Sequence, residues 1–158
     1  MTVYNFKSVG EDLVEFQNAS PSRNLRPPIG LVTPLRISTT QKDIFEMHTD
    51  LGKQIQDNLR NLILTNHGER LGLFDFGANL RPLLFEVSTS DIEQEAMSRI
   101  KASTKKFMPF VELKTFETEI DNRETTLGFA TFIFNMTYDV PAANVEGAKI
   151  RIALTAGG

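Results

Sequence analysis

The stretch TLGFATFIFNMTYDV, residues 126–140, decides the fold class of this chain. It is rich in the β-branched and aromatic residues that favour strands. Its side chains alternate between two apolar faces, one with Leu127, Phe129, Thr131 and Ile133, the other with Ala130, Phe132, Phe134 and Met136. Two apolar faces are typical of a strand inside a sheet. We therefore expect this segment to be a strand that is central or covered on both sides.

Two shorter segments on either side also alternate between apolar and polar residues. Upstream, Val111 and Leu113 alternate with charged residues from Phe110 onward. Downstream, KIRIALT at residues 149–155 places its isoleucines and its leucine on one face. A turn signal at residues 121–122 and a loop at 141–147 separate the three segments. They predict a small antiparallel sheet.

Upstream of the sheet, the apolar spacing changes to steps of three and four, as one face of a helix requires. It predicts an amphipathic helix over residues 41–65. Thr40 and Asp43 can form its capping box, and Gly68 can supply a left-handed stop. His48 would then lie in the middle of this helix and be partly exposed.

Two more helices are expected between this segment and the sheet. A short apolar helix covers about residues 79–85, where a proline is tolerated only in the first turn. A longer helix begins at Ser90, which can form a capping box with Glu93, and Pro109 stops it. Helices followed by strands predict an α+β fold, with the helices packed on a small antiparallel sheet.

The N-terminal region differs in composition from the rest. Residues 1–40 hold four of the seven prolines, which favour extended and turn conformations. We expect an extended N-terminal arm at residues 1–30 and a single α+β domain at residues 31–158.

Composition narrows the classes of function. The 158 residues carry a net charge of −3, contain no cysteine and include only two histidines. Thiolate chemistry is therefore excluded, and a multi-histidine metal site nearly so. A mildly acidic chain is a poor nucleic-acid binder. No apolar run approaches the roughly 20 residues of a membrane span. We expect no cofactor, no metal, no nucleic acid and no membrane as partners.

The junction NLRNLILTNHGERLGLFDFGANLRPLLFE, residues 58–86, is the most informative motif. Its simplest interpretation is structural: Glu69 and Arg70 would pair, and Gly68 and Gly77 would adopt positive φ. The candidate motif residues are Thr65, Gly68, Glu69, Arg70, Phe76, Gly77, Leu84 and Phe85. An enzyme alternative stays open, because Glu69 with Asp75 or Glu86 could supply the two carboxylates that a glycosidase needs.

The edge of the predicted sheet is a second candidate site. The segment at residues 149–155 lies on or near an edge, and an unprotected edge can accept a strand from another chain. The candidate partner-binding residues there are Ile150, Arg151, Ile152 and Leu154.

Residues 58–86 resemble the small lysozyme-like baseplate wedge component of contractile-tailed bacteriophages, which has a counterpart in the type VI secretion baseplate. The shared features are Leu-Ile-Leu-Thr at residues 62–65, Gly-Glu-Arg at 68–70, Phe-Gly at 76–77 and the Leu/Phe-rich segment that follows. Where the family has Glu-Pro-Arg, this chain has Met108, Pro109 and Phe110, which are further candidate partner-binding residues.

The resemblance implies a non-enzymatic structural component of a six-fold baseplate. It would dock on other wedge proteins and template assembly of the tail sheath protein by strand addition to its sheet. It would lie in the virion tail baseplate, and in the host cytoplasm during assembly. The family has also been associated with lysozyme activity, so the alternative is a peptidoglycan-cleaving enzyme that uses Glu69.

Overall fold

The computed structural model describes residues 27–39, 44–85, 89–121 and 131–155. Within them a three-stranded antiparallel sheet comprises β3 (Glu112–Asp121), β4 (Thr131–Val140) and β5 (Val145–Thr155), in the order β3-β4-β5. The central place predicted for residues 126–140 is confirmed for β4. Leu127, Phe129 and Ala130 lie outside the described residues.

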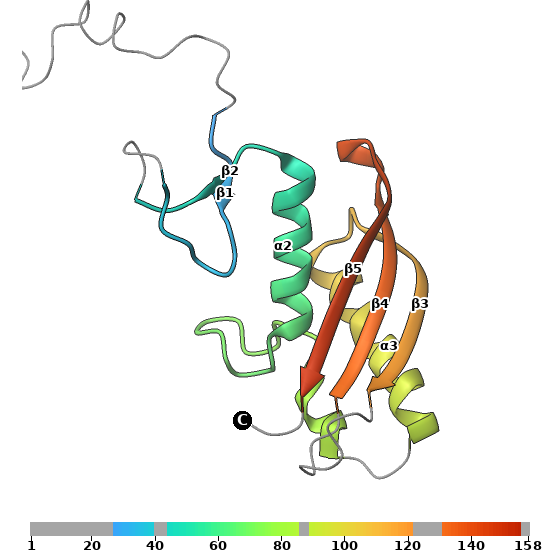
Figure 1. Ribbon diagram of the computed structural model, residues 1–158. Helices are drawn as coiled ribbons and strands as arrows, with labels where there is room; N and C mark the ends of the chain where they lie inside the picture. The colour runs from blue at the N-terminus through green and yellow to red at the C-terminus, as the bar shows by residue number, and fades with distance from the viewer. Residues whose placement is uncertain (1–26, 40–43, 86–88, 122–130, 156–158) are drawn as a thin grey trace, which may run out of the picture.

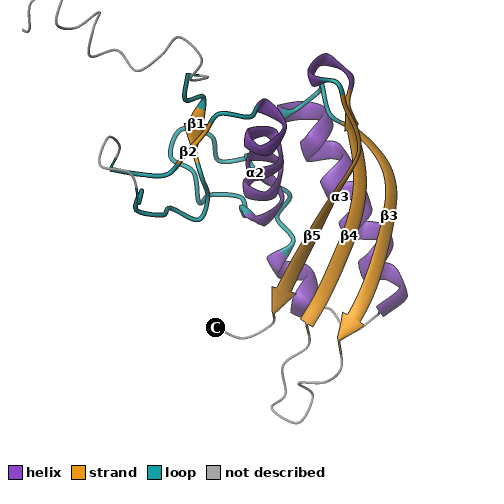
Figure 2. Cartoon of the chain, turned by 45° about the horizontal axis from the view of Figure 1, so that its top comes forward, coloured by secondary structure: helices purple, strands orange, loops and turns teal. Residues whose placement is uncertain are grey.

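Two helices cover one face of this sheet. These are α2 (Leu51–Leu64) and α3 (Thr89–Phe107), and α2 lies alongside β5 (Figures 1 and 2). Leu59 and Ile63 of α2, Ile100 of α3 and Phe134 of β4 are all buried in one core. Fully burying an aliphatic or aromatic side chain contributes about 1.5–3 kcal/mol, so this layer interface holds the fold together. The predicted α+β class, with helices on a small antiparallel sheet, is confirmed.

A second, two-stranded sheet precedes α2. It pairs β1 (Gly30–Leu31) with β2 (Met47–His48) in antiparallel register and stands on the side of α2 away from the larger sheet (Figure 1). Gly30, placed at the end of the predicted arm, belongs to β1. Residues 1–26 lie outside the described residues.

The prediction of a helix over residues 41–65 is wrong at residues 44–50. The helix begins at Leu51, and the carboxylate of Asp50 accepts hydrogen bonds from the backbone N–H groups of Gly52 and Lys53. Ile44 and Phe45 fit the helical spacing but are exposed and precede β2. Thr40 and Asp43, the predicted capping box, lie outside the described residues.

The other helix boundaries need smaller corrections. Gly68 does not stop α2, because the helix ends at Leu64 with Thr65 as its cap. The predicted helix at residues 79–85 is the 3-10 helix η1 (Arg81–Phe85), with its proline in the first turn. Helix α3 begins at Thr89, one residue before the predicted Ser90 cap, and a second 3-10 turn, η3 (Pro141–Ala143), joins β4 to β5. None of the described helices is long and apolar enough to cross a bilayer.

Candidate assembly surfaces

The motif at residues 65–79 is a loop that folds back onto the end of α2. The backbone N–H of Ala78 donates to the carbonyl of Leu62, at 3.2 Å, and that of Asn79 donates to the carbonyl of Thr65, at 3.3 Å. These bonds satisfy carbonyls that a helix end leaves without partners. The loop is therefore part of the helix end and not a separate appendage.

Gly77 is the residue that allows this return. Its φ is +109°, and a Cβ added there would lie 2.1 Å from the carbonyl oxygen of Thr65. The hydroxyl of buried Ser103 on α3 donates to the carbonyl of Gly77 at 2.6 Å. The positive φ predicted for Gly68 and Gly77 is confirmed, at +87° for Gly68.

Glu69 and Arg70 do not form the predicted ion pair. The carboxylate of Glu69 instead accepts hydrogen bonds from the side chain and the backbone N–H of Asn66, both at 2.8 Å. These bonds lower the pKa of exposed Glu69. The guanidinium of Arg70 lies 4.3 Å from the centre of the Phe76 ring, a cation–π contact.

An open cavity of about 690 Å³ lies beside this loop. Its aromatic wall includes Phe76, whose ring centre is 4.9 Å from that of Phe107. The cavity brings candidate motif and partner-binding residues together: Thr65, Glu69, Arg70 and Phe76 with Met108 and Phe110. Met108 is buried, whereas Pro109 and Phe110 are exposed. Leu84 is half-buried against the core, and Phe85 is exposed outside this cavity.

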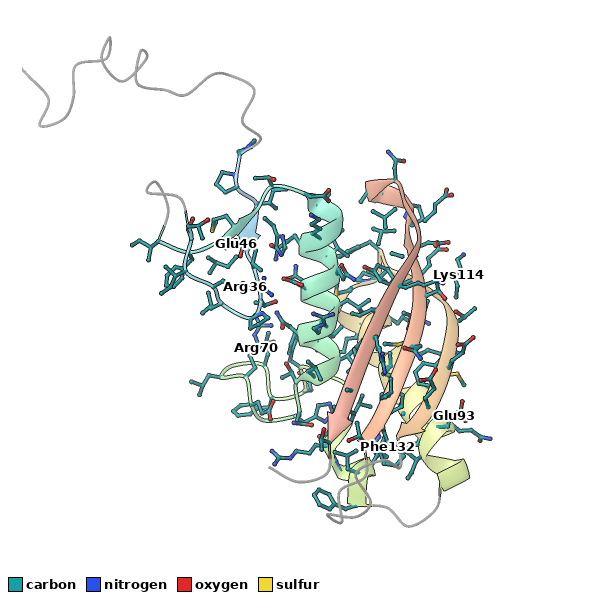
Figure 3. All side chains as sticks on the ribbon, in the orientation of Figure 1. Arg36, Glu46, Arg70, Glu93, Lys114 and Phe132 are labelled. Atoms are coloured by element: carbon teal, nitrogen blue, oxygen red, sulfur yellow. The ribbon has the colours of Figure 1, made fainter. Side chains whose placement is uncertain are left out.

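The exposed apolar side chains are concentrated in two segments. Six lie at residues 29–45, namely Ile29, Leu31, Leu35, Ile37, Ile44 and Phe45, and three lie in the motif loop, namely Leu71, Leu73 and Phe74. We call these nine the apolar surface. Leu71 is 95% exposed and Ile37 is 82% exposed. Both segments lie on the side of α2 away from the larger sheet, as Arg36, Glu46 and Arg70 show in Figure 3.

The segment at residues 29–45 was missed as a site, although its sequence carried a signal. Ile29 and Leu31, and then Leu35 and Ile37, are spaced by two within a proline-rich stretch. That spacing is typical of extended backbone with apolar residues on one face.

A buried aspartate fastens this segment to α2. One carboxylate oxygen of Asp57 lies 2.8 Å from Nε2 of His48 and accepts a hydrogen bond from the backbone N–H of Thr33 at 2.9 Å. Burial raises the pKa of Asp57, but these hydrogen bonds outweigh burial and hold it below its ordinary value. The mid-helix position expected for His48 is wrong, since His48 lies in β2, where its side chain is 11% exposed.

Strand β5 is an edge strand, as predicted, but α2 borders it. The side-chain amide of Gln56 donates to the carbonyl of Lys149 at 3.1 Å. Ile150 and Ile152 point into the core, Leu154 is half-buried, and Arg151 is exposed. Of the four predicted partner-binding residues on β5, the two isoleucines therefore have only main-chain atoms free to meet a partner.

Of the acidic residues considered for catalysis, Glu69 lines the cavity beside the motif loop, and Asp75 is not among the described residues that line it. Asp75 pairs with Lys106, which lowers the pKa of Asp75, and Glu86 lies outside the described residues. In the part of the chain that the structure describes, no group of three or more His, Cys, Asp or Glu side chains could hold a metal ion.

Comparisons with solved structures identify the fold. No family model and no curated protein matches the sequence. A chain of the anti-feeding prophage baseplate, solved by cryo-electron microscopy with six-fold symmetry, is similar, with a TM-score of 0.52 and 18% identity. The match covers 79% of this chain and 81% of that one. A candidate tail lysozyme from Geobacter sulfurreducens matches 66% of this chain and 88% of its own, with 20% identity and a TM-score of 0.49.

The resemblance inferred from residues 58–86 is therefore confirmed at the level of the fold. This chain shares its α+β fold with a chain of the anti-feeding prophage baseplate.

Proposed function

We propose that this protein is a non-enzymatic structural component of a contractile tail baseplate wedge. The observation that carries the proposal is the fold shared with the anti-feeding prophage baseplate chain over most of both chains. Its partners would be other wedge proteins and the tail sheath protein, in a six-fold assembly. It would lie in the virion tail baseplate, after assembly in the host cytoplasm.

The distribution of apolar residues supports docking on the wedge through one side of the molecule. All the large apolar side chains that are exposed in the described residues lie outside β3, β4 and β5. Exposed apolar residues gathered in neighbouring segments mark protein interfaces. The apolar surface is therefore the side we assign to the wedge, together with the cavity at Phe76 and Phe110.

The sheet supports the second half of the proposal, templating of the sheath by strand addition. A three-stranded sheet has two edges, and an added strand gains main-chain hydrogen bonds along an edge while alternating side chains fix its register. Docking on the wedge and templating of the sheath would use opposite sides of α2, so one copy could bind a wedge protein and a sheath strand at the same time.

The environment of Glu69 favours this structural role over a peptidoglycan-cleaving one. A general acid of a glycosidase needs a carboxyl with a raised pKa in an apolar setting. Glu69 is exposed, and its hydrogen bonds to Asn66 lower its pKa. The alternative lysozyme proposal would therefore need a different acid.

Deletion of the gene in the strain that produces the particle tests the proposal. We expect electron micrographs to show no sheathed tails, and complementation with the wild-type gene to restore them. Complementation with Glu69→Gln should restore them equally, since that carboxylate has no catalytic part. Normal sheathed tails in the deletion strain would overturn the proposal, and failure of Glu69→Gln with loss of cell-wall cleavage would favour the lysozyme.

A further inference from the structure

We infer that the incoming strand adds to the β3 edge, and that it is a strand with basic side chains on one face and apolar side chains on the other. This inference rests on the proposed function, and it differs from the β5 edge expected from sequence. Three observations at β3 carry it: open main-chain groups, a partly apolar cavity beneath the edge and the unpaired carboxylate of Glu117.

The main-chain groups of the two edges differ in how they are covered. On β5, the carbonyl of Lys149 accepts a hydrogen bond from Gln56 of α2, and we infer from this bond that the carbonyl points away from β4. In an antiparallel ladder, hydrogen-bonded and non-hydrogen-bonded pairs alternate. Lys149 is opposite Thr137, so the main-chain groups of Thr137 point away from β5 and toward Thr115 on β3. The main-chain groups of Thr115 therefore point toward β4, and those of Phe116 and Thr118 point outward from β3.

Those outward groups have no partner within the described chain. No described residue forms a hydrogen bond with the outward main-chain groups of Phe116 or Thr118. Figure 1 shows β3 as the outermost strand, with α2 at the opposite edge. The β3 edge is therefore the more open of the two.

A partly apolar cavity of about 140 Å³ lies beneath this edge, between α3 and β3. Its walls combine five apolar side chains with three polar ones: Met97 and Ile100 of α3, Leu113 and Phe116 of β3 and Met136 of β4, together with Lys101, Lys114 and Thr115. Both Leu113 and Phe116 are only half-buried. A similar volume, roughly 150 Å³, holds a benzene-sized group in a protein core. An apolar side chain on the inward face of an added strand would fill this cavity.

The other face of β3 is acidic. Glu117 and Glu119 are exposed there, and Glu119 accepts a hydrogen bond from Asn135 at 3.1 Å. Glu117 makes no hydrogen bond or ion pair with any described residue. The exposed basic residues Lys149 and Arg151 lie across the sheet on β5. Opposite charges on facing strands stabilise a sheet, so a lysine or arginine on the incoming strand suits Glu117.

Two peptides of ten residues, the length of β3, test this inference on the full chain. One alternates valine with lysine and the other alternates valine with glutamate. Amide hydrogen exchange, followed by NMR, reports which edge each peptide covers. We expect the lysine peptide to slow exchange at Phe116 and Thr118 at least tenfold and to leave Arg151 and Ala153 unchanged. The glutamate peptide should protect neither edge.

Matched variants separate charge from main-chain pairing. Glu117→Lys should weaken binding of the lysine peptide about fivefold, as one cross-strand ion pair becomes a like-charge pair. Glu146→Lys makes the same charge change at an exposed position of β5 and should have no effect. Thr118→Pro removes one outward N–H and should abolish binding, whereas Ala153→Pro should not. If Thr118→Pro fails to fold, the comparison of Glu117→Lys with Glu146→Lys still tests the inference.

Protection of Arg151 and Ala153 in place of Phe116 and Thr118, or protection at neither edge, would overturn the inference. An equal loss of affinity in Glu117→Lys and Glu146→Lys would also overturn it. The proposed function fails differently, through normal sheathed tails in a strain without this protein. If the peptide protects β5 and the deletion strain makes no sheathed tails, only the assignment of the strand to the β3 edge is overturned.

Discussion

Among the described glycines, Gly77 is the one where an added Cβ would come nearest to another atom. Its backbone has a φ of +109°, and an added Cβ would lie 2.1 Å from the carbonyl oxygen of Thr65. Gly77→Ala should lower the free energy of unfolding by about 3 kcal/mol, because backbone strain and displacement of the end of α2 act together. Denaturant unfolding followed by circular dichroism measures this loss.

Gly72 provides the matched control for that prediction. It also has a positive φ, +81°, but an added Cβ would meet nothing within 4 Å. Gly72→Ala should therefore cost only the backbone preference, about 1–2 kcal/mol. Equal losses in the two variants would contradict the close contact between Gly77 and Thr65.

Asp57 makes the attachment of residues 29–48 to α2 dependent on pH. Its folded pKa lies below its ordinary value, so its stabilising contribution is complete above about pH 3.9 and is lost as the pH falls through the folded pKa. Asp57→Asn should therefore open this segment at pH 6, and its difference from the wild type should shrink as the pH falls through the folded pKa of Asp57. Hydrogen exchange at the amides of Ile29 and Val32, which pair with β2 and its neighbour Glu46, measures the opening.

Asp75→Asn is the control for Asp57→Asn. It removes an exposed carboxylate that pairs with Lys106, away from the β1–β2 pair. We expect no change in exchange at Ile29 and Val32. A pH-independent difference between the wild type and Asp57→Asn would show that charge on Asp57 does not hold the segment.

At this scale, the sequence allows backbone conformation to be predicted better than side-chain partners. The positive φ of Gly68 and Gly77 could be anticipated because glycine adopts it without steric cost. The partner of Glu69 could not, because Asn66 and Arg70 are both near in sequence and only the turn of the loop decides between them.

Helix α2 shows why spacing alone misplaces an element boundary. Ile44 and Met47 continue the apolar spacing of the helix, yet they lie in the extended segment that ends in β2. The deciding residue is Asp50, whose carboxylate accepts hydrogen bonds from the first backbone N–H groups of the helix. The sequence also contains Thr40 and Asp43 as a possible capping box, and no local signal favours Asp50 over that pair.

The cap at Asp50 gives a prediction at the scale of this element. Asp50→Ala should lower the free energy of unfolding by about 1 kcal/mol, since two backbone donors lose their acceptor. Lys53→Ala, an exposed change in the same helical turn, should alter it by less than 0.5 kcal/mol. Thermal or denaturant unfolding compares the two, and indistinguishable values would contradict this helix start.

The strands were more predictable than the helix starts, because β4 is a long run of β-branched and aromatic residues and β5 alternates between apolar and polar residues. Which edge of the sheet is free was not predictable. It depends on Gln56 reaching Lys149 across 93 residues of sequence, and no local pattern marks that contact. The apolar surface was missed for the same reason, because only the fold brings residues 29–45 and the motif loop to one side of α2.

The whole molecule has two sides with different chemistry. The apolar surface lies on one side of α2, and the larger sheet, with its charged outer residues, lies on the other (Figure 3).

A double change, Leu71→Ser with Phe74→Ser, should leave the free energy of unfolding within about 0.5 kcal/mol of the wild-type value, because both side chains are exposed. It should nevertheless remove the protein from purified particles, as quantitative mass spectrometry would measure. Glu93→Gln, an exposed change on α3, is the control and should keep it there.

Cryo-electron microscopy of the purified particle would show whether this chain is a baseplate subunit. We expect the chain in the baseplate, with its apolar surface covered by another subunit and with a strand from a neighbouring chain hydrogen-bonded along the larger sheet. Particles in which the chain is present with both sheet edges bare, or complete baseplates that lack the chain, would contradict this expectation.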